Sequence, residues 1–231
     1  MYDIQAITNL AKAVLTVATP SGVMDTSLCD RAERLVRNVV TIGDSEEVAA
    51  AKSGVDMFCL KVATLFSDAG LAQNLSDQFR RTEDPTKTVD AEKLVDICEE
   101  VIEESLAAVL EPTQTRNIRR ILRQSFAGRA EMREAMILSD ARNLEDMGVT
   151  GIFNEFRRQV MGGKGVAEAI ELWRMKTDYR YWEARLKEGF HFEAVRALAR
   201  KRLETAKGFM KALENEHRGH DISRIIPETR G

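Results

Sequence analysis

Residues 134 to 148 read Glu-Ala-Met-Ile-Leu-Ser-Asp-Ala-Arg-Asn-Leu-Glu-Asp-Met-Gly, and this stretch is the most informative part of the chain. We predict a helix that begins at Glu134 and reaches Glu145. Gly148 bounds this segment, as glycine commonly does just beyond the end of a helix. The same kind of pattern continues outward from this helix in both directions.

Helical periodicity is found along most of the chain, and the alternation typical of strands is nearly absent. Apolar residues spaced three or four apart predict helices within residues 4–18, 35–43, 55–65, 94–108, 118–128 and 195–213. Asp3 is the expected N-cap of the first helix. The sequence therefore predicts an all-α protein, a compact multi-helix bundle of roughly eight to ten helices.

A further run of apolar residues suggests a helix that packs along one face. Leu172, Met175, Tyr179, Trp182 and Leu186 recur at spacings of 3, 4, 3 and 4. Such spacing predicts a single apolar seam, from residue 172 to residue 186, that packs against another helix.

Length and charge place the chain among ordinary globular proteins. Its 231 residues are 44% hydrophobic and 31% charged, so one domain can bury a sizeable core. We assign residues 1–216 to that domain, with a polar loop at residues 80–90, and residues 217–231 to a mobile C-terminal tail. A net charge of -3 favours neither nucleic acid nor an anionic membrane as a partner.

The three cysteines, Cys29, Cys59 and Cys98, are widely spaced and odd in number. Reduced thiols that pack as small hydrophobic groups fit this pattern better than a disulfide framework does. No segment approaches the roughly 18 to 20 apolar residues that span a bilayer. We therefore expect a cytoplasmic protein.

Three segments carry a resemblance to a known family. Residues 134–148 resemble the fourth motif of the HD-superfamily phosphohydrolases, E-A-x-I-[LV]-x-D-A-D-x-L-D-x-[LM]-G, with Asp140 on an aspartate that binds the metal. Leu65–Gly70, which reads LFSDAG, resembles the family's L-L-H-D-x-G, with Asp68 on its aspartate. Residues 181–216 are similar to the closing helices. The resemblance implies an HD-domain-like bundle and a metal-dependent phosphohydrolase ancestry.

The chain departs from the family at the histidines that hold the metal. Ser67 stands where the name-giving histidine precedes the aspartate, Arg31 stands at an earlier histidine, and Gln124 lies near a third. All three histidines of the chain fall within its last 41 residues. Asp68 and Asp140 are the surviving residues of ligand type, and two carboxylates do not make a closed transition-metal site.

The preferred interpretation is a degenerate, non-catalytic HD-domain protein with a binding or regulatory role and no cofactor. Its vestigial pocket would contain Arg31, Asp68, Gln124 and Asp140, with Ser67 beside Asp68, and would accept a small anionic or phosphorylated ligand. Arg31, joined by Arg120 or Arg123, would replace the metal and pair with both aspartates, because a guanidinium supplies fixed positive charge and several donors.

Two alternatives remain open at this point. In the first, Asp68, Asp140 and Asp30 hold Mg²⁺ or Mn²⁺, and the protein hydrolyses a phosphate ester or a nucleotide. Ser67 is a poor candidate nucleophile, because no histidine lies near it in the sequence to activate it. In the second, the protein is a structural module that forms a homo-oligomer through the seam at residues 172–186.

Other polar groups are weaker candidates. Residues 162–165, Gly-Gly-Lys-Gly, lack the rest of a phosphate-binding loop and are expected to be a connection between two helices. His191 is expected near the start of a helix and partly buried. His217 and His220 lie in the tail, where a mobile backbone makes a poor preorganised metal site.

Overall fold

The computed structural model describes residues 3–50, 54–81, 89–128 and 130–222, and within these ranges the chain is almost entirely helical. The predicted all-α fold class is confirmed. The helices are α1 (Ile4–Leu15), α2 (Ser27–Gly43), α3 (Glu46–Ala49), α4 (Met57–Phe66), α5 (Ala69–Arg81), α6 (Ala91–Leu106), α7 (Pro112–Phe126), α8 (Arg133–Asp146), α9 (Val149–Met161), α10 (Val166–Asp178), α11 (Tyr181–Glu188) and α12 (Glu193–His217). None of them is long and apolar enough to cross a membrane.

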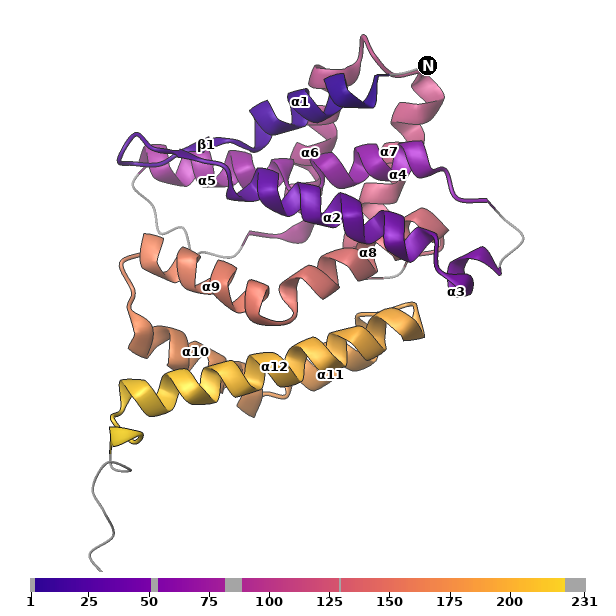
Figure 1. Ribbon diagram of the computed structural model, residues 1–231. Coiled ribbons are helices and arrows are strands. Elements are labelled where there is room, and N and C mark those ends of the chain that lie inside the picture. The colour runs from indigo at the N-terminus through magenta and orange to yellow at the C-terminus, as the bar shows by residue number, and fades with distance from the viewer. Residues whose placement is uncertain (1–2, 51–53, 82–88, 129, 223–231) are drawn as a thin grey trace, which may run out of the picture.

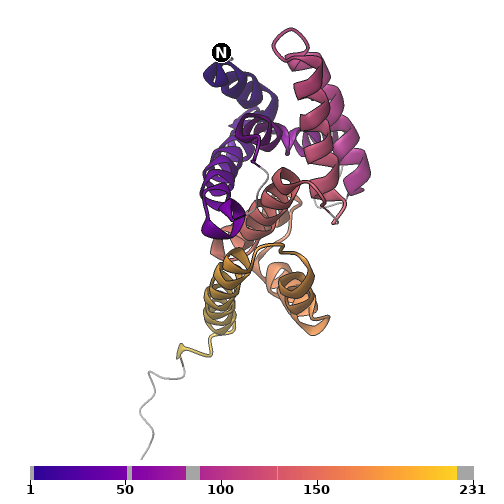
Figure 2. The same ribbon diagram turned by 90° about the vertical axis from the view of Figure 1, so that its right-hand side faces the viewer.

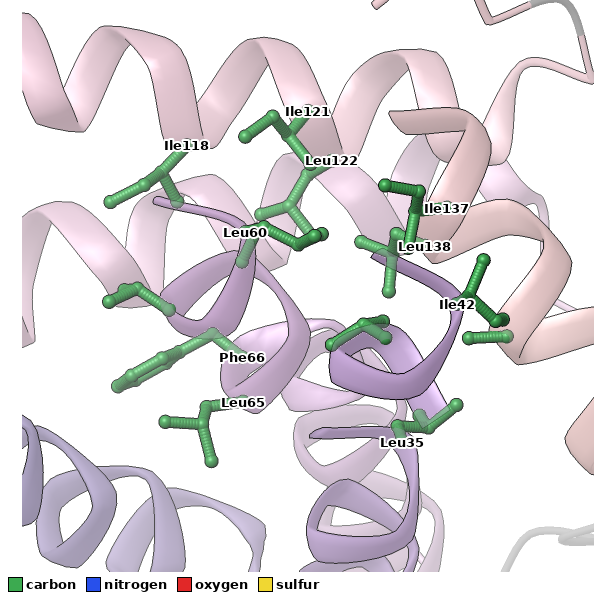
Figure 3. Packing of buried hydrophobic residues seen from close by; sticks show 14 of the residues in the cluster. Leu35, Ile42, Leu60, Leu65, Phe66, Ile118, Ile121, Leu122, Ile137 and Leu138 are labelled. Atoms are coloured by element: carbon green, nitrogen blue, oxygen red, sulfur yellow. The ribbon is translucent and has the colours of Figure 1, made fainter. Parts of the chain in front are cut away.

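Helix α4 lies at the centre of the main core. Its sequence, MFCLKVATLF, is apolar on almost every face, so the helix must be surrounded by other helices to bury it. It packs against α1, α2, α7 and α8. Figure 3 shows Leu60 and Phe66 of α4 among apolar side chains from α2, α7 and α8. Complete burial of such a side chain contributes roughly 1.5 to 3 kcal/mol.

A second layer, made of α9 to α12, lies beneath the N-terminal body (Figures 1 and 2). Helix α12 contacts α8, α9, α10 and α11, and α8 contacts α2, α4 and α7 in the body. A smaller apolar cluster of Ile152, Ile170, Ala206 and Met210 joins α9, α10 and α12. The two layers meet where α8 contacts α9 and α12.

The predicted seam at residues 172–186 is wrong as a single helix face. The segment is divided between α10 and α11, because Arg180 adopts the left-handed backbone conformation with φ of 53°. Trp182 is buried, whereas Tyr179 is 79% exposed. The change of direction at Arg180 therefore prevents the five residues from forming one continuous helix face.

The ends of several predicted elements are also clarified. Asp3 caps α1 as expected, because its Oδ1 accepts a hydrogen bond from the backbone N–H of Gln5 at 2.9 Å. The first helix ends at Leu15 rather than residue 18, and β1 (Val17–Ala18) pairs with β2 (Met24–Asp25) in a short antiparallel hairpin. Helix α12 includes His217. Residues 82–88 of the predicted loop and 223–231 of the predicted tail lie outside the described residues.

Gly70 is required where α5 meets α6. A Cβ at this position would lie 2.2 Å from the backbone carbonyl oxygen of Leu94. We expect Gly70→Ala to lower the free energy of unfolding by about 2 kcal/mol, because backbone must move to admit the methyl group. Gly208→Ala in α12 is the matched control, since a Cβ there meets nothing within 4 Å. Chemical denaturation should show that the control raises the free energy of unfolding by about 0.5 to 1 kcal/mol. A Gly70→Ala variant as stable as wild type would contradict the close approach of Gly70 to Leu94.

Candidate functional site

A pocket of about 380 Å³ lies between the N-terminal body and the second layer, and we call it the central pocket. Helices α2, α5, α8, α9, α10 and α11 all contribute side chains to its wall, together with Ser67 and Asp68 from the turn between α4 and α5. Segments that are far apart in the sequence therefore meet in one cavity.

Asp68 lines this pocket and is only 2% exposed. Nη1 of Arg31 donates to both carboxylate oxygens, at 2.9 and 2.8 Å, and Nη1 of Arg142 donates to Oδ1 at 3.0 Å. Burial alone would raise the pKa of Asp68, but the attraction of Arg31 and Arg142 outweighs it and lowers the pKa below its ordinary value. Asp68 is thus an ionised carboxylate whose charge is balanced by two guanidinium groups.

Arg142 is held in place by more than Asp68. Its Nη1 also donates to the carbonyl oxygen of Ser67 at 3.1 Å, and its guanidinium lies 4.1 Å from the centre of the Phe126 ring. Stacking on an aromatic face favours arginine over lysine, because the guanidinium is planar and weakly hydrated. The positive charge beside Asp68 is therefore a fixed part of the wall.

Asp146 extends the ionic network across the pocket. Its Oδ1 accepts from Nη2 of Arg31 at 2.9 Å, and its Oδ2 accepts from Nη2 of Arg185 at 2.8 Å. Partial desolvation in the pocket opposes ionisation, yet Arg31 and Arg185 together lower the pKa of Asp146 to about 2. The side chain is 43% exposed, so this carboxylate is accessible to solvent even though both of its oxygens are bonded.

The lowered pKa of Asp146 predicts a pH dependence of stability. A carboxyl group whose pKa is lower in the folded protein than in the unfolded chain stabilises the fold at a pH above the unfolded pKa. For Asp146 the unfolded pKa is near 3.9, and this stabilisation is lost as the pH falls through the folded value of about 2. We expect the difference in unfolding free energy between wild type and Asp146→Asn to be constant above about pH 5 and to shrink toward pH 2. Denaturation curves recorded across this range test it, and a difference that does not change with pH would contradict the assignment.

Asp140 does not join this site. Asp140 is fully buried, and its carboxylate bonds to the segment just before α12. Oδ1 accepts a hydrogen bond from the backbone N–H of His191 at 2.8 Å and also lies 2.8 Å from Nδ1 of the same residue. Oδ2 accepts from the backbone N–H of Phe192 at 3.0 Å. The expected pairing of Arg31 with both aspartates is therefore correct for Asp68 and wrong for Asp140. Residues 140 and 142 are two positions apart and face different sides of α8.

The remaining candidates of the predicted pocket are distributed elsewhere. Gln124 does not line the central pocket; it lines a different pocket of about 680 Å³ between α6 and α7. Its Oε1 accepts hydrogen bonds from the backbone N–H groups of Glu131 and Met132. Ser67 does line the central pocket, but its hydroxyl donates to the carbonyl oxygen of Thr64. Asp30 is exposed on α2. In the described part of the chain, Asp30, Asp68 and Asp140 form no metal-binding group.

The two candidate arginines of α7, Arg120 and Arg123, lie away from Asp68. Arg123 binds Glu99 and Asp96 of α6, and Arg120 lines the pocket that contains Gln124, so neither replaces a metal beside Asp68.

The N–H of Gly165 donates to Oε2 of Glu168 at 2.9 Å, which caps α10 and confirms residues 162–165 as a connection between helices. His191 is partly buried beside the start of α12, as expected.

Arg142, Asp146 and Arg185 are site residues that sequence reasoning missed. Arg142 stands at the second aspartate of the D-A-D pattern quoted above, so a substitution there was visible in the sequence. Arg142 and Asp146 are also four positions apart, which places them on one helix face. Nothing in the sequence pairs Arg185 with Asp146, because that contact depends on the turn at Arg180.

The pocket is rich in cations and aromatic rings. Six of its lining residues are cationic and four are acidic, which gives an excess of two positive charges; the cations are Arg31, Arg142, Arg157, Arg158, Lys176 and Arg185, and the acids are Asp25, Asp68, Asp146 and Glu155. Trp173 and Trp182 lie with ring centres 4.9 Å apart on α10 and α11. The Nζ of Lys176 lies 5.8 Å from the centre of the Trp182 ring.

Solved structures with this architecture are known, although no family model and no curated protein matches the chain. Bacillus subtilis YpgQ in complex with ADP is 15% identical, with a TM-score of 0.58, over 93% of this chain and 97% of that one. SeMet-YpgQ of the same organism is 17% identical, with a TM-score of 0.58, over 97% and 94%. The Lin1889 protein of Listeria innocua is 18% identical, with a TM-score of 0.57, over 93% and 95%. At these identities the similarity shows a shared fold.

Proposed function

We propose that this chain is a degenerate HD-domain protein that binds a small phosphorylated ligand in the central pocket without a metal and without hydrolysing it. The observation that carries this proposal is the pairing of Asp68 with Arg31 and Arg142. Two guanidinium groups neutralise the carboxylate that the resemblance to HD phosphohydrolases assigns to the metal. A regulatory or sensing role follows naturally from binding without turnover.

The residues around Asp68 do not suit a divalent cation. A metal within coordination distance of this carboxylate would lie close to Arg31 and Arg142, and the like charges would repel strongly in a partly buried setting. Magnesium and manganese also require several oxygen ligands. The other acid in contact with Arg31 is Asp146, which already bonds to Arg185.

The charge and shape of the pocket favour an anion that carries a planar group. An excess of two positive charges matches a phosphoryl dianion. The rings of Trp173, Tyr181 and Trp182 offer an aromatic surface at the α10–α11 end of the cavity. Because YpgQ was crystallised with ADP, ADP is the first probe to test. The expected location in the cytoplasm, where such ligands are abundant, agrees with three cysteines that are buried and unpaired.

Isothermal titration calorimetry with ADP in EDTA tests the proposal, together with a phosphate-release assay in Mg²⁺ or Mn²⁺. We expect saturable binding in EDTA and no phosphate release. Lys176→Gln removes a cation from the pocket wall and should weaken binding, whereas Lys207→Gln, at a surface ion pair of α12, should not. Metal-dependent phosphate release that disappears in Asp68→Asn would support the hydrolase alternative instead. An absence of ADP binding would contradict the proposal.

A further inference from the structure

The carboxylate of Asp146 occupies a position that suits the anionic group of a ligand. It lies between guanidinium groups from α2 and α11 and accepts one hydrogen bond from each, at 2.9 Å from Arg31 and 2.8 Å from Arg185. Charge-assisted hydrogen bonds of this kind, from guanidinium groups to anionic oxygens, are also the ones by which arginines bind phosphates. The pocket thus contains a formed anion site, and a side chain of the protein fills it.

Asp146 is less firmly enclosed than the other acid of the network. Its side chain is 43% exposed, against 2% for Asp68. It is also the last residue of α8, where the carbonyl end of the helix dipole disfavours a negative charge. A rotation of the Asp146 side chain would carry its charge away from the site toward solvent.

Both arginines have hydrogen-bond partners other than Asp146, and these would hold them in place if Asp146 left the site. Arg31 remains bound through Nη1 to both oxygens of Asp68. Oδ1 of Asn143 accepts hydrogen bonds from Nε of Arg185 at 3.2 Å and from its Nη2 at 2.8 Å. Nη1 of Arg185 also donates to the hydroxyl of Tyr181 at 2.8 Å. Two donors would then face an empty position, and a phosphoryl group has the charge and the oxygens to accept from both.

We propose that Asp146 is a built-in competitor, which holds the anion site between Arg31 and Arg185 until a phosphoryl group displaces it. The inference rests on the proposed ligand-binding function and adds a regulatory step to it. A ligand that binds only after Asp146 withdraws has an apparent affinity reduced by the fraction of molecules in which the site is open. Binding also exchanges the direct contact between α8 and α11 for one made through the ligand.

Calorimetric titration of ADP and of inorganic phosphate into wild type, Asp146→Asn and Glu155→Gln tests the competition. Glu155 is the matched control, because it is an acid of the same pocket that pairs with Arg158 and Lys176 rather than with Arg31 or Arg185. We expect Asp146→Asn to bind ADP at least tenfold more tightly, and Glu155→Gln to gain threefold or less. Equal gains in the two variants would assign the effect to pocket charge alone and overturn the proposal.

The outcomes separate this inference from the function on which it rests. Wild type that binds ADP, with no gain in Asp146→Asn, would retain the binding function and refute the competition. Failure of every variant to bind either probe would refute both. Binding by Asp146→Asn alone would support the competition in its strongest form. If the asparagine variant does not fold, Asp146→Ser carries the same expectation, because a shorter neutral side chain also removes the competing carboxylate.

Discussion

Asp68→Asn is expected to lower the free energy of unfolding by about 3 kcal/mol, because it leaves two guanidinium groups without the buried carboxylate that balances them. The side chains of Arg31 and Arg142 are only 11% and 19% exposed, so solvent cannot fully replace the lost partner. The new amide would also direct N–H donors at arginine donors. Chemical denaturation monitored by circular dichroism measures the loss.

Asp77→Asn in α5 is the matched control for this prediction. Asp77 forms an ion pair with Arg80 on the surface, where the two side chains are 43% and 72% exposed. The same substitution should change stability there by less than about 1 kcal/mol, as is usual for solvent-exposed pairs. An Asp68→Asn variant as stable as its control would show that the arginines do not depend on Asp68.

Asp140→Asn is expected to cost a similar amount, about 3 kcal/mol, for a different reason. Asp140 is fully buried, and its carboxylate accepts backbone hydrogen bonds that fix the entry into α12. An amide nitrogen placed against one of these N–H groups leaves a buried donor without an acceptor. Asp30→Asn, on the exposed face of α2, is the control and should fall within about 0.5 kcal/mol of wild type.

The double variant separates the two aspartates. Among the described residues, Asp68 and Asp140 share no hydrogen-bond partner, so their effects on stability should add to within about 0.5 kcal/mol. If both carboxylates held one metal, the second substitution would cost much less than the first. A large coupling in the double-mutant cycle would therefore contradict the separation seen in the structure.

The fold was largely predictable because its signal is local. Apolar spacing within segments such as residues 55–65 requires a buried helix, and α4 is one. The prediction was wrong at residues 172–186, where the apolar pattern continues across a change of direction. The left-handed conformation of Arg180 makes that turn, and nothing in the periodicity marks it.

The site was predictable only in part. Arg31 beside Asp68 was expected because Arg31 stands at a histidine position of the HD pattern and Asp68 on its aspartate, and the contact is present. The partner of Asp68 on α8 was not expected, because alignment to the motif directed attention to Asp140 rather than to Arg142. Helix geometry decides this point, since residues two apart on a helix face in different directions and residues four apart share a face. Contacts between distant segments, such as Arg185 with Asp146, required the folded structure.

The metal content of the protein tests the central claim most directly. Tag-free wild type and Asp68→Asn would be incubated with Mn²⁺, Fe²⁺, Ni²⁺, Zn²⁺ and Mg²⁺, dialysed exhaustively and measured by plasma mass spectrometry. The pairing of Asp68 with Arg31 and Arg142 predicts far less than one equivalent of any metal in wild type and no difference in the variant. Near one equivalent of a transition metal in wild type, lost in Asp68→Asn, would contradict a pocket whose charge is balanced by arginine.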